Sequence, residues 1–471
     1  MKPHARITAQ SGPATGDAAR PVLVAAATIA LVAAVASPAT AQWDGNEEVW
    51  NGGWPSFNRG AAEPAKKTKA DRAKRCLADV RLDDALTSSQ PLVSEDTAYA
   101  MSRAINRYQR IVSQGGWKEI PAVKGRWMRE GVTDDRVTML RRRLVMSGDM
   151  QPHRTNAPTT FDRGVREGLQ RFQIRHGIRP KGVVDRRTLR ALNVSAQVRL
   201  GQLRLNLTRL RSLLDHVAKN RAAGNDRYVL VNAPSYELQA VRGDRLELAS
   251  KVIVGKPTTQ TPAIHASIKG LNFFPFWRVP DSIANRDLIP TIIKKPNYLR
   301  DQGIRVLDKW GGNEIDPATI DWRTAAGRGF KFRQDPGEKN ALGLVRVNMP
   351  NSEIVYLHDT PTKNLFNSST RAFSAGCVRV QRITDLVKWL AAEEAEWDDR
   401  RVDSVFNDGV AVDVRFAKNV PVTFAYVTAW ASDAGMAHFR ADIYGRDGVS
   451  VLIAAAEPLP GQQIPSFQLS P

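Results

Sequence analysis

The sequence predicts an α+β protein in which a mainly-β domain follows a helical half. Hydrophobic residues recur every three or four positions through much of residues 76–225, as they do in amphipathic helices. From Tyr228 the period shortens and β-branched residues become frequent, as in strands. The strand pattern breaks off near residue 280 and resumes near residue 335, which indicates a segment inserted into the β domain. A chain of 471 residues has room for two or three such domains.

The first 41 residues have the pattern of a secretory signal peptide. Basic residues precede an apolar run from Val22 to Ala36, and small residues at Ala39 and Ala41 suit a cleavage site. The run is shorter than the roughly 20 residues that a membrane-spanning helix needs. We therefore expect residues 1–41 to direct export of a soluble protein, with an uncleaved anchor as the alternative.

Composition limits the partners that we expect. The 42% hydrophobic content is ordinary for a globular protein. Lys and Arg number 68 against 48 Asp and Glu, which gives a formal net charge of +20. This balance favours an anionic polymer, and a solvated basic surface is the alternative. Export and the lack of a nucleic-acid-binding motif in the sequence argue against nucleic acid.

The elements before the β domain follow from local patterns. Residues 42–75 predict a flexible linker, because Gly, Pro, Asn and charged residues dominate them without sustained periodicity. Residues 76–133 and 195–225 predict a helical scaffold. Apolar residues follow helical spacing in both parts, and glycines at 115, 116 and 224 end the helices.

Residues 134–194 predict three short helices. Each run of helical spacing is too short to be stable alone, so the three must share a core. Gly148 and Gly177 end the first two helices, and Asp185 is placed to cap the third.

The same segment resembles the peptidoglycan-binding domain, a three-helix module often appended to wall enzymes. The matching positions are Leu169-Gln170, Phe172-Gln173, Gly177, Lys181-Gly182, Thr188 and Leu192-Asn193. The usual Asp-Gly of that family is Lys-Gly in this chain. A purely structural three-helix insert is therefore the alternative to a module that binds glycan.

Residues 226–420 predict the β domain, with a cap inserted at about 280–335. The cap contains Trp310 and Trp322 among several glycines, and we expect a lid over a cleft or, alternatively, a decoration. Residues 421–471, which include VPVTFAYVTAW and ADIYGRDG, predict a closing β-hairpin and a tail.

The chain has two cysteines, and Cys377 follows the small residues Ala375 and Gly376. In an exported protein a disulfide to Cys76 is one explanation. The other is a catalytic thiol, which needs a base because a thiol is mostly protonated at neutral pH. His358 stands at the end of a predicted strand, and the loop after it is long enough to bring the two side chains together. The small residues leave backbone N–H groups open to an oxyanion, and the histidines lack metal-ligand spacing, so we expect no metal.

The run YLHDTPTKNLFNSSTRAFSAGCVRV resembles the active-site segment of the L,D-transpeptidases, cysteine enzymes that cross-link bacterial peptidoglycan. Their signature is a His, a spacer and Ser-x-Gly-Cys, matched here by His358, Ser374, Gly376 and Cys377. The segments FWRVPDSI, NALG and NMP extend the likeness to the large periplasmic branch of that family. Many members have His where Ala375 stands. The resemblance covers most of residues 76–430.

The resemblance implies a role for each matching residue. Cys377 is the nucleophile, His358 is the base, and the main-chain carbonyl of Asp359 orients the imidazole. Gly376 belongs to the oxyanion region. Contacts to the substrate are expected from Tyr356, Ser374, Trp277 and Arg379. Arg379 suits a carboxylate, and the alternatives are that Tyr356 only packs and Arg379 only braces the loop.

The implied reaction is acyl transfer on a stem tetrapeptide of peptidoglycan in the periplasm, without a cofactor. Cys377 attacks the carbonyl of the third residue, releases the terminal D-alanine and forms a thioester. An amine of another stem gives a 3-3 cross-link, an amine of an outer-membrane protein attaches that protein to the wall, and water trims the stem. The rival hypotheses are an L,D-carboxypeptidase and a non-catalytic protein that binds peptidoglycan and its glycan.

Overall fold

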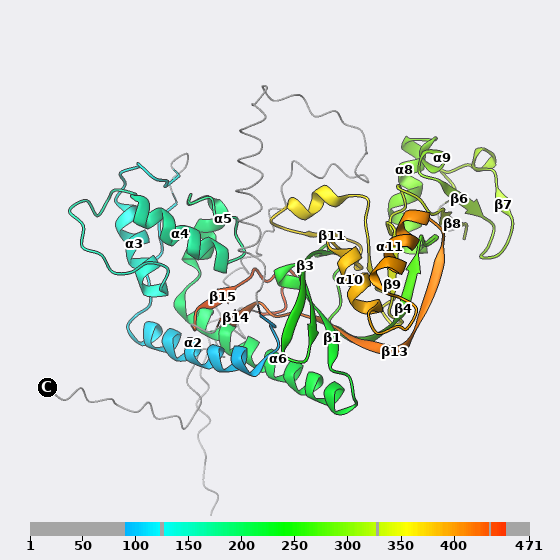
Figure 1. Cartoon of the computed structure of the whole chain (residues 1–471). Coiled ribbons are helices and arrows are strands. Elements are labelled where there is room, and N and C mark those ends of the chain that lie inside the picture. The colour runs from blue at the N-terminus through cyan, green and yellow to red at the C-terminus, as the bar shows by residue number, and fades with distance from the viewer. Residues whose placement is uncertain (1–89, 123–126, 326–328, 433–434, 449–471) are drawn as a thin grey trace, which may run out of the picture. The chain divides into compact units, whose positions relative to one another are not determined.

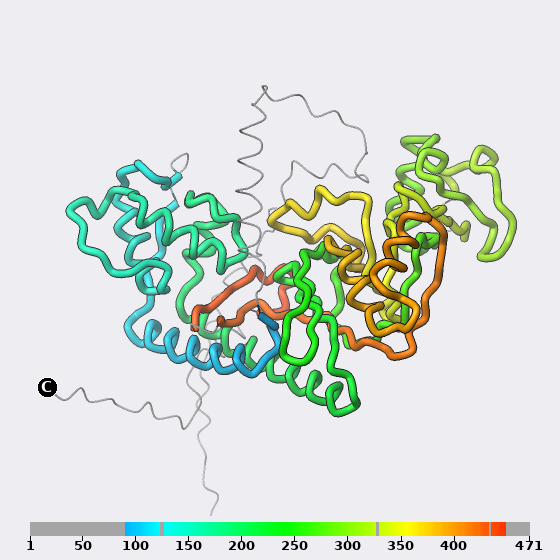
Figure 2. Tube along the Cα trace, in the orientation of Figure 1, coloured from blue at the N-terminus to red at the C-terminus, as the bar shows by residue number. Residues whose placement is uncertain are grey.

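The computed structural model describes residues 90–122, 127–325, 329–432 and 435–448 (Figures 1 and 2). The predicted signal peptide and linker, Cys76 and the end of the predicted tail lie outside the described residues. All described residues belong to one compact unit. They form an α+β fold, which confirms the predicted fold class. Among them no helix is both apolar enough and long enough to span a membrane.

Two long helices form the predicted scaffold. Helix α2 (Glu95–Ser113) begins where the side chain of Ser94 accepts a hydrogen bond from the N–H of Thr97, and α6 (Ala196–Ala222) is capped in the same way by Ser195. The two helices lie side by side (Figure 1) and share a core with a small hairpin, β14 (Ala429–Ala431) and β15 (Ala437–Phe439). This apolar contact stabilises the scaffold against the β domain.

Three shorter helices form the predicted three-helix module. They are α3 (Arg136–Ser147), α4 (Arg163–Arg175) and α5 (Arg186–Asn193). Asp185 accepts a hydrogen bond from the N–H of Thr188, so it caps α5 as predicted, and Gly148 ends α3 in the left-handed conformation. Leu140, Leu169 and Leu192 lie in one shared core. Arg187 of α5 also donates hydrogen bonds to the hydroxyls of Ser369 and Thr370, in the loop that leads to the nucleophile segment.

The β domain is built on a nine-stranded sheet in the order β11-β3-β12-β10-β9-β4-β13-β1-β2. A further pairing of β2 with β3 closes the sheet on itself. Helices α10 (Ile383–Ala391) and α11 (Asp399–Asp408) contribute to its core. The strands are β1 (Arg227–Asn232), β2 (Glu237–Arg242), β3 (Arg245–Gly255), β4 (Ile264–Phe273), β9 (Val345–Asn348), β10 (Leu357–His358), β11 (Ala372–Ser374), β12 (Val378–Val380) and β13 (Val412–Ala425).

The inserted segment is a small subdomain with a core of its own. It lies between β4 and β9, which pair directly with each other, so it leaves and re-enters the sheet at neighbouring strands. Its strands form a separate sheet in the order β5-β8-β6-β7. Its elements are β5 (Trp277–Val279), α7 (Asp281–Ile283), η3 (Ala284–Leu288), α8 (Ile289–Lys294), α9 (Tyr298–Asp301), β6 (Ile304–Leu307), β7 (Glu314–Ile315), η4 (Pro317–Thr319) and β8 (Lys331–Gln334).

The C-terminal segment differs from its prediction. Residues 421–425, expected in a closing hairpin, continue β13, which runs between β1 and β4 in the main sheet. All side chains from Val420 to Ala425 are buried, which is the pattern of a central strand covered on both faces. The hairpin that does form, β14 with β15, begins later. The ADIYGRDG segment contains turns and no strand among its described residues.

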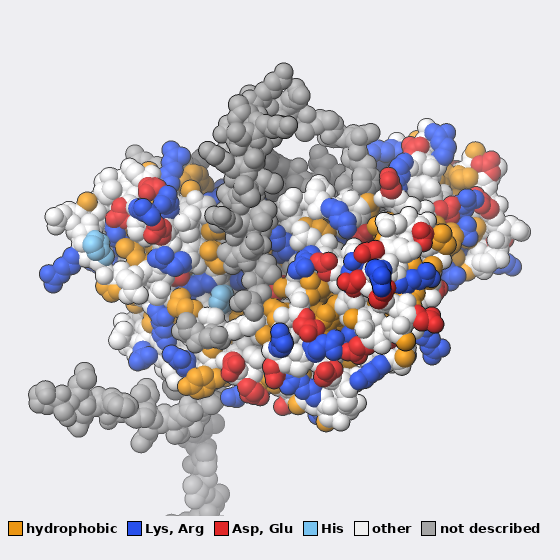
Figure 3. Space-filling model, in the orientation of Figure 1, with side chains coloured by type: hydrophobic (Ala, Val, Ile, Leu, Met, Phe, Trp, Pro, Cys, Tyr) orange, Lys and Arg blue, Asp and Glu red, His pale blue; other side chains and the backbone are white. Residues whose placement is uncertain are grey.

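Positively and negatively charged side chains are both present on the surface of the protein. On the face drawn in Figure 3, Lys and Arg side chains are interspersed with Asp and Glu side chains. Ion pairs among the described residues include Arg305 with Glu314 and Lys388 with Asp403. The two signs of charge are therefore intermixed on the face that Figure 3 shows.

Candidate active site

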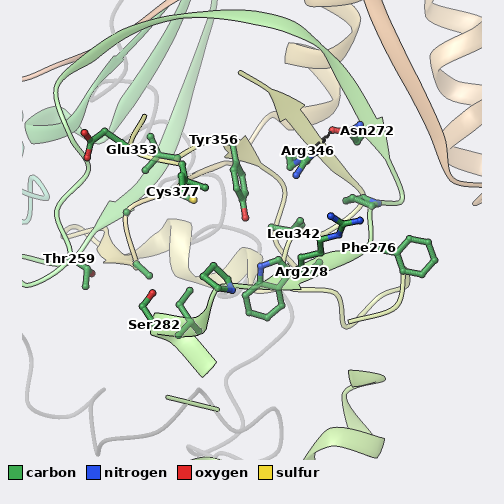
Figure 4. A pocket seen from close by; sticks show the side chains of 18 of the residues that line it. Thr259, Asn272, Phe276, Arg278, Ser282, Leu342, Arg346, Glu353, Tyr356 and Cys377 are labelled. Atoms are coloured by element: carbon green, nitrogen blue, oxygen red, sulfur yellow. Dashed lines mark hydrogen bonds between the residues drawn. The ribbon is translucent and has the colours of Figure 1, made fainter. Parts of the chain in front are cut away.

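A cavity of about 1100 Å³ opens beside Cys377. Its walls come from the end of β4, the first part of the inserted subdomain, the segment around β9 and β10, and the loop before β12 (Figure 4). In Figure 4, Tyr356 stands between Cys377 and Arg346 along one wall. Such a volume is sufficient for a peptide several residues long.

The strand pattern brings the predicted catalytic residues onto one face of the sheet. β10 and β12 are parallel neighbours, with Leu357 opposite Val378 and His358 opposite Arg379. Leu357 and Val378 are fully buried in the main core. Because successive side chains of a strand alternate between faces, His358, Cys377 and their neighbours two positions away point to the other face. The structure therefore places the thiol, immediately before β12, and the imidazole, in the adjacent strand β10, on the same side.

The segment that carries the thiol is held by the buried hydroxyl of Ser374. This hydroxyl donates a hydrogen bond of 2.5 Å to the carbonyl of Cys377 and accepts one of 3.2 Å from the N–H of Gly376. Gly376 has a φ of +125°, a conformation that favours glycine. Because the N–H of Gly376 is engaged by Ser374, it is not directed at an oxyanion. The N–H of Cys377 makes no hydrogen bond with another described residue and is the available donor.

Neighbouring segments brace this loop from behind. Thr261 donates a hydrogen bond to the carbonyl of Gly376, and Thr259 donates one to the carbonyl of Ser374. The hydroxyl of Tyr444 in turn donates to the carbonyl of Gly255 and accepts from the N–H of Thr261. Thr259, Thr261 and Tyr444 were not predicted from the sequence, because nothing in their local pattern indicates contact with this loop. The loop lies more than a hundred positions after the two threonines and about seventy before the tyrosine.

The environment keeps the thiol protonated in the resting protein. Burial raises the pKa of the half-buried Cys377 thiol above its ordinary value. Hydrogen bonds from Tyr356 act in the opposite direction, and so do the positive charges of Arg379 and Arg346. These three side chains would stabilise the thiolate when it forms during a reaction.

His358 is 5% exposed and neutral in the resting protein. Burial lowers its pKa to about 3, and the positive charge of Arg379 adds to this effect. Backbone groups of Asp359 and Leu342 favour the protonated ring, but Nδ1 makes no well-aligned hydrogen bond with a described residue. The ring packs edge-on against Tyr356, with centroids 5.7 Å apart.

These pKa values favour a thiol and a neutral imidazole over a thiolate–imidazolium pair. The described hydrogen bonds do not join Sγ to the imidazole, so any proton transfer between them belongs to the substrate-bound state. Catalytic hydrogen bonds are often long or poorly aligned before the substrate binds. The arrangement can therefore perform nucleophilic attack in which the base takes the proton as the new bond forms.

Two family models match the chain over separate segments. One is the YkuD model, described as the L,D-transpeptidase catalytic domain, and it matches residues 226–413. The other is described as "Putative peptidoglycan binding domain" and matches residues 133–192. The chain contains an L,D-transpeptidase catalytic domain. The likeness of the three-helix module to peptidoglycan-binding domains is likewise confirmed at the level of the family.

A relative of the transpeptidase domain is described as "Putative L,D-transpeptidase" from Haemophilus influenzae. It is 37% identical over 220 residues, which are 46% of this chain and 44% of the relative, so the chain matches less than half of that protein's length. An L,D-transpeptidase structure from Mycobacterium smegmatis is 10% identical, with 42% of this chain and 58% of that chain covered and a TM-score of 0.18. An L,D-transpeptidase structure (residues 123–326) from Xylanimonas cellulosilytica is 13% identical, with 65% and 100% covered and a TM-score of 0.18.

Within the transpeptidase domain the side chain of Asp359 has a structural role. Its carboxylate accepts a hydrogen bond from the N–H of Leu344 and forms an ion pair with Lys363. A Cβ at Gly343 would collide with this carboxylate. The main-chain carbonyl of Asp359 was predicted to orient the imidazole of His358. Nδ1 of that imidazole has no well-aligned hydrogen-bond partner among the described residues, so this role stays a prediction.

The residues predicted to bind substrate divide into two groups. Tyr356 and Trp277 line the cavity, and the two side chains are hydrogen-bonded to each other. Ser374 is 3% exposed and Arg379 donates a hydrogen bond to Thr362, and neither is among the residues that line the cavity. Arg346 was not predicted from the sequence, and it lines the cavity and acts electrostatically on Cys377.

No group of His, Cys, Asp and Glu among the described residues could hold a metal ion. Cys377 is a free thiol.

Proposed function

We propose that this protein is an L,D-transpeptidase that acts on stem tetrapeptides of peptidoglycan through a thioester on Cys377. The observation that carries the proposal is a half-buried free thiol on the wall of a large cavity, immediately before β12, with His358 in the neighbouring strand β10. The match to a transpeptidase family model over residues 226–413 supports the same reaction class.

In the first step Sγ of Cys377 attacks the carbonyl carbon of the third residue of the stem, and its proton passes to the imidazole of His358. The carbonyl oxygen becomes negative and accepts a hydrogen bond from the N–H of Cys377, in the manner of an oxyanion hole. The bond to D-alanine then breaks, and the imidazolium returns its proton to the leaving amine. The products of this step are D-alanine and a thioester.

In the second step an amine attacks the thioester and Cys377 leaves as the thiol. An amine of a second stem yields a 3-3 cross-link, and an amine of an outer-membrane protein would attach that protein to the wall. The inserted subdomain lines part of the cavity, and shielding by it would favour an amine over water. An L,D-carboxypeptidase, in which water is the acceptor, is the second candidate.

The remaining parts of the chain support an extracytoplasmic location. The predicted signal peptide would export the protein to the periplasm, where its substrate lies. The three-helix module would hold the enzyme near peptidoglycan, whose stem carboxylates suit a chain with a net charge of +20.

The test is to incubate the purified protein with disaccharide-tetrapeptide and to measure the masses of the products. A transpeptidase gives a cross-linked dimer, a carboxypeptidase gives only tripeptide, and a binding protein leaves the mass unchanged. Cys377→Ala should abolish turnover and the covalent adduct on the protein. The control is Ser282→Ala, at an exposed serine on the same cavity, which should retain turnover. Turnover by Cys377→Ala would refute the assignment of the nucleophile.

A further inference from the structure

A row of polar residues crosses five adjacent strands of the sheet and includes the proposed base. Asp413 of β13 lies opposite Asn272 of β4, which lies opposite Arg346 of β9. Arg346 lies opposite His358 of β10, which lies opposite Arg379 of β12. Residues opposite one another in a sheet share a face. His358 therefore stands between two arginines, and only one of them, Arg346, lines the cavity.

The guanidinium of Arg346 is held in a fixed position. Its Nε and Nη2 donate hydrogen bonds of 3.0 and 2.8 Å to Oδ1 of Asn272. The amide nitrogen of Asn272 donates a hydrogen bond of 2.6 Å to Asp413, and this sets the orientation of the amide. The guanidinium also lies over the ring of Tyr356, with Cζ 5.5 Å from the centroid. Figure 4 shows this arrangement, with Arg346 linked to Asn272 beside Tyr356.

One end of this guanidinium has no partner among the described residues. Nη1 of Arg346 makes no hydrogen bond with any of them, and Arg346 forms no ion pair with their carboxylates. The guanidinium of Arg346 is thus oriented by a neutral group, the amide of Asn272. The nearest acid of the row, Asp413, bonds to that amide. A guanidinium that is fixed but not neutralised is prepared to bind an anion.

The other arginines of the cavity wall differ from Arg346. Arg286 is exposed and forms an ion pair with Asp287. Arg278 is exposed and lies over the ring of Trp310. Arg346 alone among the lining arginines is half-buried and anchored through hydrogen bonds to the sheet.

We infer that Arg346, positioned by Asn272 and Asp413, binds a carboxylate of the acyl-donor peptide. The inference rests on the proposed function for the identity of the peptide. The sequence-based expectation assigned a carboxylate of the stem to Arg379, which is not among the residues that line the cavity.

The distance between Arg346 and Cys377 limits which carboxylate of the peptide can be bound. Arg346 and Cys377 lie two strands apart, which corresponds to roughly 10 Å between their backbones. Part of this distance is covered by the arginine side chain, and an extended peptide covers about 3.3 Å per residue. The carboxylate therefore lies within one or two residues of the attacked carbonyl. Two sources fit this requirement: the C-terminal carboxylate of the leaving D-alanine and, in stems whose third residue carries one, a side-chain carboxylate of that residue.

The experiment measures binding in a protein that cannot react. In the full-length chain with Cys377→Ala, the dissociation constant of the free tetrapeptide is measured by calorimetry with Arg346 intact and with Arg346→Gln. Each measurement is repeated with two modified peptides, one amidated at the C-terminus and one amidated at the side chain of the third residue. Arg278→Gln is the matched control, because it removes an arginine from the same cavity.

We expect Arg346→Gln to weaken binding of the unmodified tetrapeptide roughly 10- to 100-fold, as for loss of a charge-assisted hydrogen bond. The peptide amidated at the recognised carboxylate should bind equally weakly to both proteins, and this arm identifies the source. Arg278→Gln should change the dissociation constant less than threefold.

The inference is overturned if Arg346→Gln binds all three peptides as tightly as its parent, if it weakens all three equally, or if the parent binds none of them. A separate assay of acyl transfer by the unmodified protein tests the proposed function. If binding depends on Arg346 and on one carboxylate while no acyl transfer occurs, the binding site stands and the proposed reaction fails. If acyl transfer occurs and binding ignores Arg346, the reaction stands and this inference fails.

Discussion

Replacing Ser374 by alanine should release the loop that carries the thiol without removing any group that reacts. The hydroxyl of Ser374 makes two hydrogen bonds across the turn, to the N–H of Gly376 and to the carbonyl of Cys377. Ser374 is 3% exposed, so water cannot readily take the place of the hydroxyl. Ser374→Ala therefore leaves one donor and one acceptor without partners, unless the loop moves to reach solvent.

Each buried polar group left without a partner costs about 1 to 3 kcal/mol. For two groups we expect a cost of at least about 2 kcal/mol in the native arrangement of the loop. Every 1.4 kcal/mol changes an equilibrium about tenfold, so the ratio of native to displaced loop should fall roughly 30-fold. A displaced loop exposes Sγ and disorders the proposed oxyanion donor. Alkylation of Cys377 by iodoacetamide, which proceeds through the displaced loop, should become up to about 30-fold faster. Acyl transfer, which needs the native loop, should become slower, by at most about 30-fold.

Both rates would be measured in a Cys76→Ser background, so that only Cys377 reacts with iodoacetamide. The control is Ser282→Ala, because Ser282 is exposed on the same cavity and its hydroxyl makes no hydrogen bond with another described residue. It should leave both rates unchanged. The reasoning is wrong if Ser374→Ala changes neither rate by more than twofold, or if it slows both rates equally.

Two further predictions concern pH. Burial lowers the pKa of His358 to about 3 and raises the pKa of Cys377. Because neither group then titrates between about pH 5 and pH 8, kcat/KM for acyl transfer should be flat over this range. An ionisation near pH 6.5 in the measured profile would contradict this. Burial also lowers the pKa of His438 to about 3, so this ring stays neutral in the folded protein at pH values where the unfolded chain binds a proton. The contribution of His438 to the stability of the fold is therefore complete above pH 6.5 and is lost progressively as the pH falls towards 3. At pH 5 the loss of unfolding free energy for a single histidine is about 2 kcal/mol. Urea unfolding at pH 7 and at pH 5 measures this loss, and His438→Gln should make the difference between the two free energies smaller. An unchanged difference would count against a buried neutral His438.

Local patterns were sufficient for most of the helices. Hydrogen-bonding caps and left-handed glycines depend on residues a few positions apart, and Asp185 and Gly148 act as predicted. The change from helical to alternating spacing near Tyr228 also marks the start of the β domain in the structure. The C-terminal hairpin was misplaced because residues 421–425 resemble an isolated strand in sequence. Only the pairing of β13 with both β1 and β4 makes them part of the central sheet.

The sequence by itself determined that a small-residue turn precedes Cys377 and that a histidine ends a nearby strand, because both are local features of the chain. The tertiary structure decided which residues surround them. Asp413, Asn272 and Arg346 are far apart in the chain, and they meet because three strands pair in one register. Register depends on the packing of the whole sheet, and a shift by one residue would turn these side chains to the opposite face. In the same register, Arg346 lines the cavity and Arg379 is not among its lining residues.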